Sequence, residues 1–267
     1  MNKNYNLPAS TGLVWLKAGF KIMKTAPVAT SGIVAFYLLL MLVAGMPGAL
    51  LNVPFIDILL SGLVTPFGAV AIASCGRDVS KGIIPTIFQC YGECFKNTSV
   101  RNKLLLLGLI YGVCVILISL VFSWLSADDV DKWFSKDGKL LPNEIVSNFP
   151  WAAVLFGFVF YTALLCVTCF SPMLIAWKGM PLGKAFFFSL FVCLKNAGAF
   201  IVLGLLLALI ATFGTTSLSA LGAILGINSV LVVLWGLFIT CWSYCTLWPI
   251  WSSIFGDQDS QIVSYTK

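Results

Sequence analysis

Five long stretches without a charged residue constrain this chain more than any other feature of its sequence. They separate Lys24 from Asp57, Asp57 from Arg77, Lys103 from Asp128, Glu144 from Lys178, and Lys195 from Asp257. A membrane-spanning helix needs about 20 apolar residues. The first four stretches therefore hold one helix each, and the last holds two, divided at 215–229. The sequence predicts six transmembrane helices, near 28–48, 54–75, 104–125, 151–177, 198–218 and 229–252.

Composition agrees with lipid as the solvent of most side chains. Hydrophobic residues make up 60% of the chain and charged residues 10%, with a mean hydropathy of +0.99; soluble domains carry about a quarter charged residues. In lipid, backbone polar groups must be bonded internally, which leaves α-helices or closed β-barrels. Barrel strands alternate apolar and polar residues, whereas these apolar runs are unbroken. We therefore expect an all-α integral membrane bundle, forming one membrane domain over residues 1–267.

Lysine and arginine are divided unequally between the two sets of loops. Thirteen flank one side of the expected spans, whereas three lie on the other side, in the acidic loop 126–150. Short loops rich in Lys and Arg stay in the cytoplasm, so we expect both termini to be cytoplasmic. The basic side also suits anionic lipid headgroups, and its charge requires no nucleic-acid partner.

Three segments share one plan: an amphipathic stretch, a lysine beside a helix breaker, and an apolar span. The amphipathic stretches are 13–24, 84–96 and 186–195. The second helix of each hairpin carries a proline (Pro66, Pro172 or Pro249), and a proline inside a helix usually kinks it. We therefore expect three repeats of an interfacial amphipathic helix plus a transmembrane hairpin. The units lie near 8–78, 79–178 and 179–253, and a cytoplasmic tail covers 254–267.

The first amphipathic stretch supplies candidate contacts to lipid headgroups. Its three lysines recur on one face of the expected helix: Lys17, Lys21 and Lys24. Apolar residues recur at helical spacing on another face: Leu13, Leu16, Phe20 and Met23. A helix with this pattern lies in the membrane interface, with its apolar side down and its lysines toward the headgroups. We expect the apolar ridge to insert into lipid and the lysines to contact anionic lipid.

Asp57 is the one acid inside an expected span. Charges in lipid are costly, so an intramembrane acid is a candidate functional residue. Asp57 also lies three residues after Pro54, near the outer boundary, where it can stabilise the first turn of a helix. We favour this structural role over a functional one.

The sequence contains no recognisable catalytic, cofactor or metal site. It has no histidine, which removes the commonest general base and metal ligand. Spacings of three or four residues place cysteines in pairs on one helix face: Cys90 with Cys94, Cys166 with Cys169, and Cys241 with Cys245. Buried cysteine is more often a small hydrophobic residue than a ligand. We therefore expect no metal and no enzymatic activity, and whether the last two pairs meet is left open.

Three stretches together resemble an uncharacterised family of proteobacterial inner-membrane proteins. They are PASTGLVWLKAGF at 8–20, GIIP at 82–85, and WKGMPLGKAFFFSL at 177–190 with its Lys195–Asn196 continuation. More remotely, the hairpin plan is similar to the membrane domain attached to some glycerophosphodiester phosphodiesterases, which is not their catalytic part. The resemblance implies a bacterial inner membrane and assigns no activity to any residue.

Two functions remain open at this level. The leading one is a non-enzymatic protein that binds anionic lipid or a membrane-protein partner, or acts as a scaffold. The alternative is a small-solute transporter or channel, which needs polar groups along a path through the spans. The spans offer few candidates for such a path: Asp57, Thr65, Ser171, Thr240 and Ser243. Convergence of these side chains favours transport, whereas their dispersal favours binding.

Overall fold

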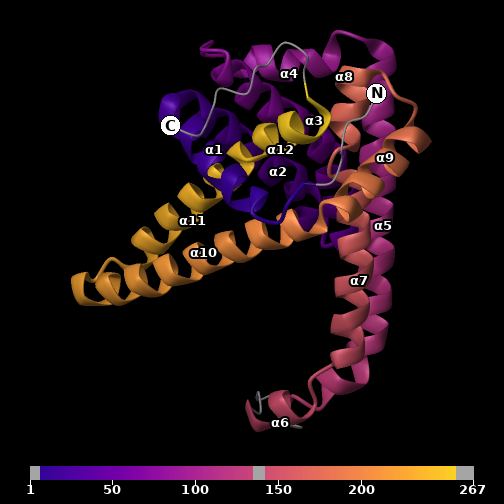
Figure 1. The fold of residues 1–267 in the computed structure, drawn as a ribbon. Helices are drawn as coiled ribbons and strands as arrows, with labels where there is room; N and C mark the ends of the chain where they lie inside the picture. Colours follow the sequence, from indigo (N-terminus) through magenta and orange to yellow (C-terminus); the bar gives the residue numbers. More distant parts are fainter. Residues whose placement is uncertain (1–6, 135–141, 257–267) are drawn as a thin grey trace.

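The computed structural model describes residues 7–134 and 142–256, which form twelve α-helices (Figure 1). In chain order they are α1 (Thr11–Thr25), α2 (Pro27–Leu51), α3 (Pro54–Ser80), α4 (Ile87–Phe95), α5 (Thr98–Asp131), α6 (Pro142–Ser147), α7 (Trp151–Thr168), α8 (Ser171–Lys178), α9 (Leu182–Lys195), α10 (Ala197–Leu225), α11 (Asn228–Cys245) and α12 (Leu247–Phe255).

Among the residues that the structure describes, six helical segments are long and apolar enough to cross a membrane, which confirms the predicted number. They are Pro27–Leu51, Phe55–Ser80, Thr98–Asp131, Trp151–Lys178, Ala197–Leu225 and Asn228–Phe255. Several exceed their predicted bounds because charged residues can continue a helix beyond the apolar layer. α5, expected at 104–125, takes in Arg101 and Lys103 at one end and acidic residues at the other. The long stems of Lys and Arg allow their charges to reach water from such positions.

The fourth and sixth spans each consist of two helices. α7 gives way to α8 at 169–170, before Pro172, and α11 gives way to α12 at Thr246, before Pro249. Proline lacks the backbone N–H that would continue the hydrogen-bond ladder. α3, in contrast, runs through Pro66 as one helix. The fifth and sixth spans meet at a turn narrower than the expected 215–229, because α10 continues to Leu225 and Gly226 closes it in the left-handed conformation (φ +70°).

Five of the shorter helices, α1, α4, α8, α9 and α12, gather at one end of the molecule, whereas α6 lies at the tip of the α5/α7 hairpin (Figure 1). At the end with the five helices, α3 is central: it packs against α2, α4, α5, α8 and α12, and its Val70, Ala71 and Ala73 are fully buried. The hairpins α5/α7 and α10/α11 diverge from this core, and many of their large apolar side chains are exposed. Such surfaces suit lipid as the surrounding solvent.

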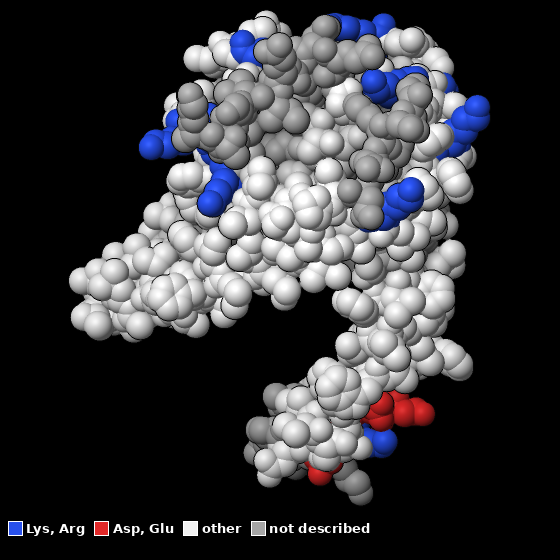
Figure 2. Space-filling view, in the orientation of Figure 1, with Lys and Arg blue, Asp and Glu red and all other residues white. Residues whose placement is uncertain are grey.

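Figure 2 shows Lys and Arg around the end where these five helices gather, and acidic residues with a basic side chain beside them at the tip of the α5/α7 hairpin. We call the former the basic end; it comprises α1, α4, α8, α9 and α12. Residues 135–141 of the acidic loop and residues 257–267 of the predicted cytoplasmic tail lie outside the described residues.

The order of the helices includes three short helices that each stand before a pair of spans, and the predicted repeat itself stays a prediction. A short helix precedes two spans in α1–α2–α3, in α4–α5–α7/α8 and in α9–α10–α11/α12. α4 begins at Ile87 rather than 84, because Thr86 and Gln89 form a capping box at its N-terminus. The equivalence of the three units in space stays a prediction.

The predicted apolar ridge of α1 is wrong in part. Leu16 and Met23 are buried in the protein and cannot insert into lipid, whereas Leu13 and Phe20 remain 41% and 39% exposed. α1 packs against α10 and α11, so it is a component of the bundle as well as a surface helix.

Two glycines explain why α1 packs so closely. A Cβ placed on Gly19 would lie 2.7 Å from Thr246 Cγ2, and one placed on Gly12 would overlap the backbone at Ala199. Small residues allow helix backbones to approach each other. These glycines therefore allow the face of α1 that carries Leu16 to pack closely against the rest of the protein.

Candidate functional site

The three candidate lysines lie on the solvent-accessible side of α1. Lys17, Lys21 and Lys24 are all exposed, while the opposite side of the helix is buried against its neighbours. The exposed Leu13 and Phe20 lie on the same helix. The structure thus presents the lysines from an anchored helix at the basic end.

Asp57 lies in the first turn of α3, at the opposite end of the spans, as predicted. Its carboxylate packs against Gly48 in the last turn of α2, where no Cβ could be accommodated. One of its oxygens, Oδ1, is buried without a hydrogen-bond partner among the described residues. This packing within the hairpin agrees with a structural role, and a functional role stays a prediction.

Three of the four hydroxyl groups considered for a solute path are bonded within their own helical segments. Thr65, Ser171 and Ser243 each donate a hydrogen bond to a carbonyl oxygen of their own helical segment, at 2.9, 2.6 and 2.8 Å respectively. Neither they nor Asp57 line the large pocket described below.

The cysteines form neighbouring groups of free thiols. Cys166 and Cys169 lie beside Cys193, whereas Cys241 and Cys245 lie beside Cys75. Within residues 7–134 and 142–256, no three His, Cys, Asp or Glu side chains form a group that could hold a metal ion.

A polar network centred on Glu93 was not anticipated from the sequence. Glu93 projects from α4 toward α3 and α8. Its Oε1 accepts from Arg77 Nη2 at 2.5 Å, and its Oε2 accepts from Ser74 Oγ at 2.8 Å and from Trp177 Nε1 at 3.2 Å. The Arg77 guanidinium also lies over the Trp177 ring, 5.4 Å from its centroid. The network therefore joins three elements through one carboxylate.

The charge of Glu93 is stabilised despite its burial. Burial alone would raise its pKa, but the hydrogen bonds from Arg77 and Ser74, the charge of Arg77 and the bond from Trp177 together hold the pKa below the usual value. Its position as the one acid in the amphipathic stretch 84–96 is the signal that could have identified it.

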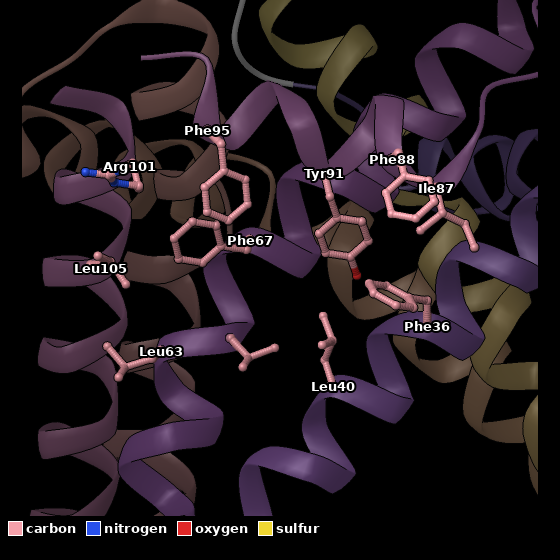
Figure 3. Close-up of a pocket in the computed structure, with 11 residues that line it drawn as sticks. Phe36, Leu40, Leu63, Phe67, Ile87, Phe88, Tyr91, Phe95, Arg101 and Leu105 are labelled. Carbon is pink, nitrogen blue, oxygen red and sulfur yellow. The ribbon is translucent and has the colours of Figure 1, made fainter. Parts of the chain in front are cut away.

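An apolar pocket of about 450 Å³ lies between α2, α3, α4 and α5 (Figure 3). α4 forms one wall, and Arg101 of α5 is the one charged residue in the lining. The lining residues are Phe36, Leu40, Leu63, Val64, Phe67, Ile87, Phe88, Tyr91, Phe95, Arg101 and Leu105. Pockets of this volume lie within the range that binds small ligands.

Comparison with known proteins places the chain in a family. It is 31% identical over 266 residues to a protein of Burkholderia thailandensis described as a probable inner membrane protein, and the match covers 94% of this chain and 93% of that protein. The chain belongs to the same family of inner-membrane proteins. No protein-family model and no solved structure matches it. The predicted inner-membrane family is confirmed, while nothing in these comparisons supports the remoter similarity to the membrane domain of glycerophosphodiester phosphodiesterases.

Proposed function

We propose that this inner-membrane protein is a non-enzymatic lipid-binding protein that holds anionic phospholipids at the cytoplasmic face of the membrane. The observation that carries the proposal is the row of exposed lysines on α1, Lys17, Lys21 and Lys24, on a helix whose other side is buried in the bundle. Both termini are cytoplasmic in this proposal, because the positive-inside rule assigns the basic end to the cytoplasm.

Electrostatics makes this row sufficient for a measurable preference. A lysine near an anionic membrane surface contributes on the order of 1 kcal/mol, although salt screens the interaction over a Debye length of about 8 Å. Because α1 packs against α10 and α11, its backbone does not have to be ordered when lipid binds. Such preorganisation favours binding.

The alternative of a solute transporter or channel has less support. A solute path needs polar groups that face a shared space, but the hydroxyls of Thr65, Ser171 and Ser243 are directed to their own helices. The lining of the large pocket is almost wholly apolar. Binding therefore accounts for the described residues better than transport.

The test replaces lysines on α1 and measures retained lipid. Lys17→Glu with Lys24→Glu should lower the retention of anionic phospholipid several-fold after purification from native membranes, as measured by mass spectrometry of the extracted lipid. Lys178→Glu with Lys184→Glu is the matched control, because it makes the same charge change at the same end but away from α1. Equal losses in the two variants, or no loss in the first, would overturn the proposal and leave the lysines a role in topology alone.

A further inference from the structure

The pocket between α2, α3, α4 and α5 opens on an apolar surface beside two candidate membrane spans. Phe88 and Phe95 in its α4 wall are 87% and 56% exposed, and Leu105 on α5 is 40% exposed. α2 and α5 are both candidate membrane spans. In Figure 3 the labelled apolar side chains from the four helices surround one open space. A cavity of this kind next to lipid is filled by hydrocarbon rather than water, because its walls offer water few polar partners.

Arg101 supplies the one charge in the pocket lining, and helix stability does not explain its position. It lies in the first turns of α5, where the helix dipole disfavours a cation. Within the described parts of the chain, its guanidinium has no ion-pair partner, and it is only partly exposed. A phosphate group at this place would satisfy both the guanidinium and the positive end of the helix.

We infer that this pocket is a binding site for one anionic phospholipid, with an acyl chain among the apolar residues and the phosphate on Arg101. The inference rests on the proposed function in one respect, since both require anionic lipid at the basic end. The site itself is separate, because none of the α1 lysines lines the pocket.

The two parts of the lipid contribute differently to binding. An acyl chain that leaves the bilayer for the pocket exchanges one apolar environment for another, so its burial adds little affinity. The contact between Arg101 and the headgroup therefore determines which lipid is held. Arg binds phosphate through two parallel hydrogen bonds, whereas Lys binds it as a point charge.

The Glu93 network keeps the site formed before lipid arrives. α4 supplies Ile87, Phe88, Tyr91 and Phe95 to the pocket, and the contacts of Glu93 with Arg77 and Ser74 fix α4 to α3. α3 in turn contributes Leu63, Val64 and Phe67 to the same lining. Two walls of the pocket are thus tied together by an ion pair outside it.

The decisive experiment is native mass spectrometry of the full chain, delipidated in detergent and titrated with phosphatidylglycerol or phosphatidylcholine. The wild-type protein should retain one phosphatidylglycerol in preference to phosphatidylcholine. Arg101→Gln should weaken that binding at least tenfold, and Arg101→Lys should lie between the two. Lys103→Gln is the matched control, since Lys103 is two residues away on α5 and does not line the pocket; it should bind as the wild type does.

A second variant tests the apolar part of the site. Leu63→Trp fills the pocket and should reduce binding of both lipids, while the α1 variant Lys17→Glu with Lys24→Glu should keep the single tightly held lipid. Equal affinities for the two lipids, or equal losses in Arg101→Gln and Lys103→Gln, would overturn the inference. Should Leu63→Trp fail to fold, the Arg101 series decides alone. In the Lys17→Glu with Lys24→Glu variant, loss of surface lipid together with retention of the single lipid would show that the pocket and the α1 lysines are separate sites.

Discussion

Gly62, Gly108 and Gly112 determine how closely α3 and α5 cross. A Cβ on Gly108 would lie 2.6 Å from the carbonyl oxygen of Gly62, and a Cβ on Gly62 would lie 2.9 Å from the carbonyl oxygen of Gly108. Backbones at such separations leave no room for a side chain, which is the use of small residues in membrane helix packing. The Gly108–Gly112 spacing thus serves packing within the chain.

Replacement of Gly108 by Ala should therefore destabilise the bundle. The added methyl group has to push α3 and α5 apart, and such overpacking costs about 1–3 kcal/mol. The midpoint of thermal unfolding in detergent should fall. Gly45→Ala in α2 is the control, because a Cβ there meets nothing within 4 Å, and its midpoint should not fall. Equal midpoints for the two variants would show that the crossing of α3 and α5 adjusts without cost.

At the scale of elements, the Glu93 carboxylate of α4 bonds to α3 and to α8. Glu93→Gln removes the charge that holds Arg77 and should cost about 2 kcal/mol, as expected for hydrogen bonds that involve charged groups. Detachment of α4 would expose Cys90 and Cys94, which are 1% and 0% exposed in the folded protein. Burial also raises the pKa of the Cys94 thiol to about 12, so its thiolate is scarce while α4 stays in place.

Alkylation of these two thiols, followed by peptide mass spectrometry, measures the effect of Glu93→Gln. Both should react faster in the variant than in the wild type. Asp78→Asn is the matched control: it removes the second carboxylate bonded to Arg77, at 2.9 Å, but leaves the bonds of Glu93 to α3 intact. Equal rates in wild type and Glu93→Gln would mean that apolar packing alone holds α4.

The Glu93 carboxylate should also make the attachment of α4 depend on pH. The folded-state pKa of Glu93 lies below its ordinary value of 4.5. The charge of Glu93 therefore stabilises the folded state at pH values of 4.5 and above. This contribution decreases as the pH falls toward and through the folded-state pKa. Protection of the α4 amides from hydrogen exchange, corrected for the intrinsic rate, should be constant from neutral pH to about 5 and should decrease below it. A decrease between pH 7 and pH 5 would contradict this assignment.

At the scale of the whole molecule, the sequence predicts the membrane spans. It does not predict which helices pack against one another. The six spans follow from charge spacing because a charge in hydrocarbon is costly. The burial of Leu16 and Met23 was not predicted, because it depends on which helix covers α1. Glu93 and Arg77 meet only through the folding of α4 onto α3, and Arg101 acquires its pocket only where four helices converge. Periodicity identifies faces of helices, but it does not identify their partners.

The orientation of the whole molecule gives the last prediction. Figure 2 shows Lys and Arg gathered at the basic end, whereas the tip of the α5/α7 hairpin carries acidic residues with a basic side chain beside them. The positive-inside rule assigns the basic end to the cytoplasm. A cysteine introduced at Ser147, exposed in α6 near that tip, should react with a membrane-impermeant maleimide in intact spheroplasts. A cysteine at Lys184, exposed on α9, should react only after permeabilisation. The unmodified chain controls for its own nine cysteines. Labelling of Lys184→Cys in intact spheroplasts would contradict the orientation and would remove the cytoplasmic leaflet as the source of the proposed lipid, because the α1 lysines and Arg101 would then face the periplasm.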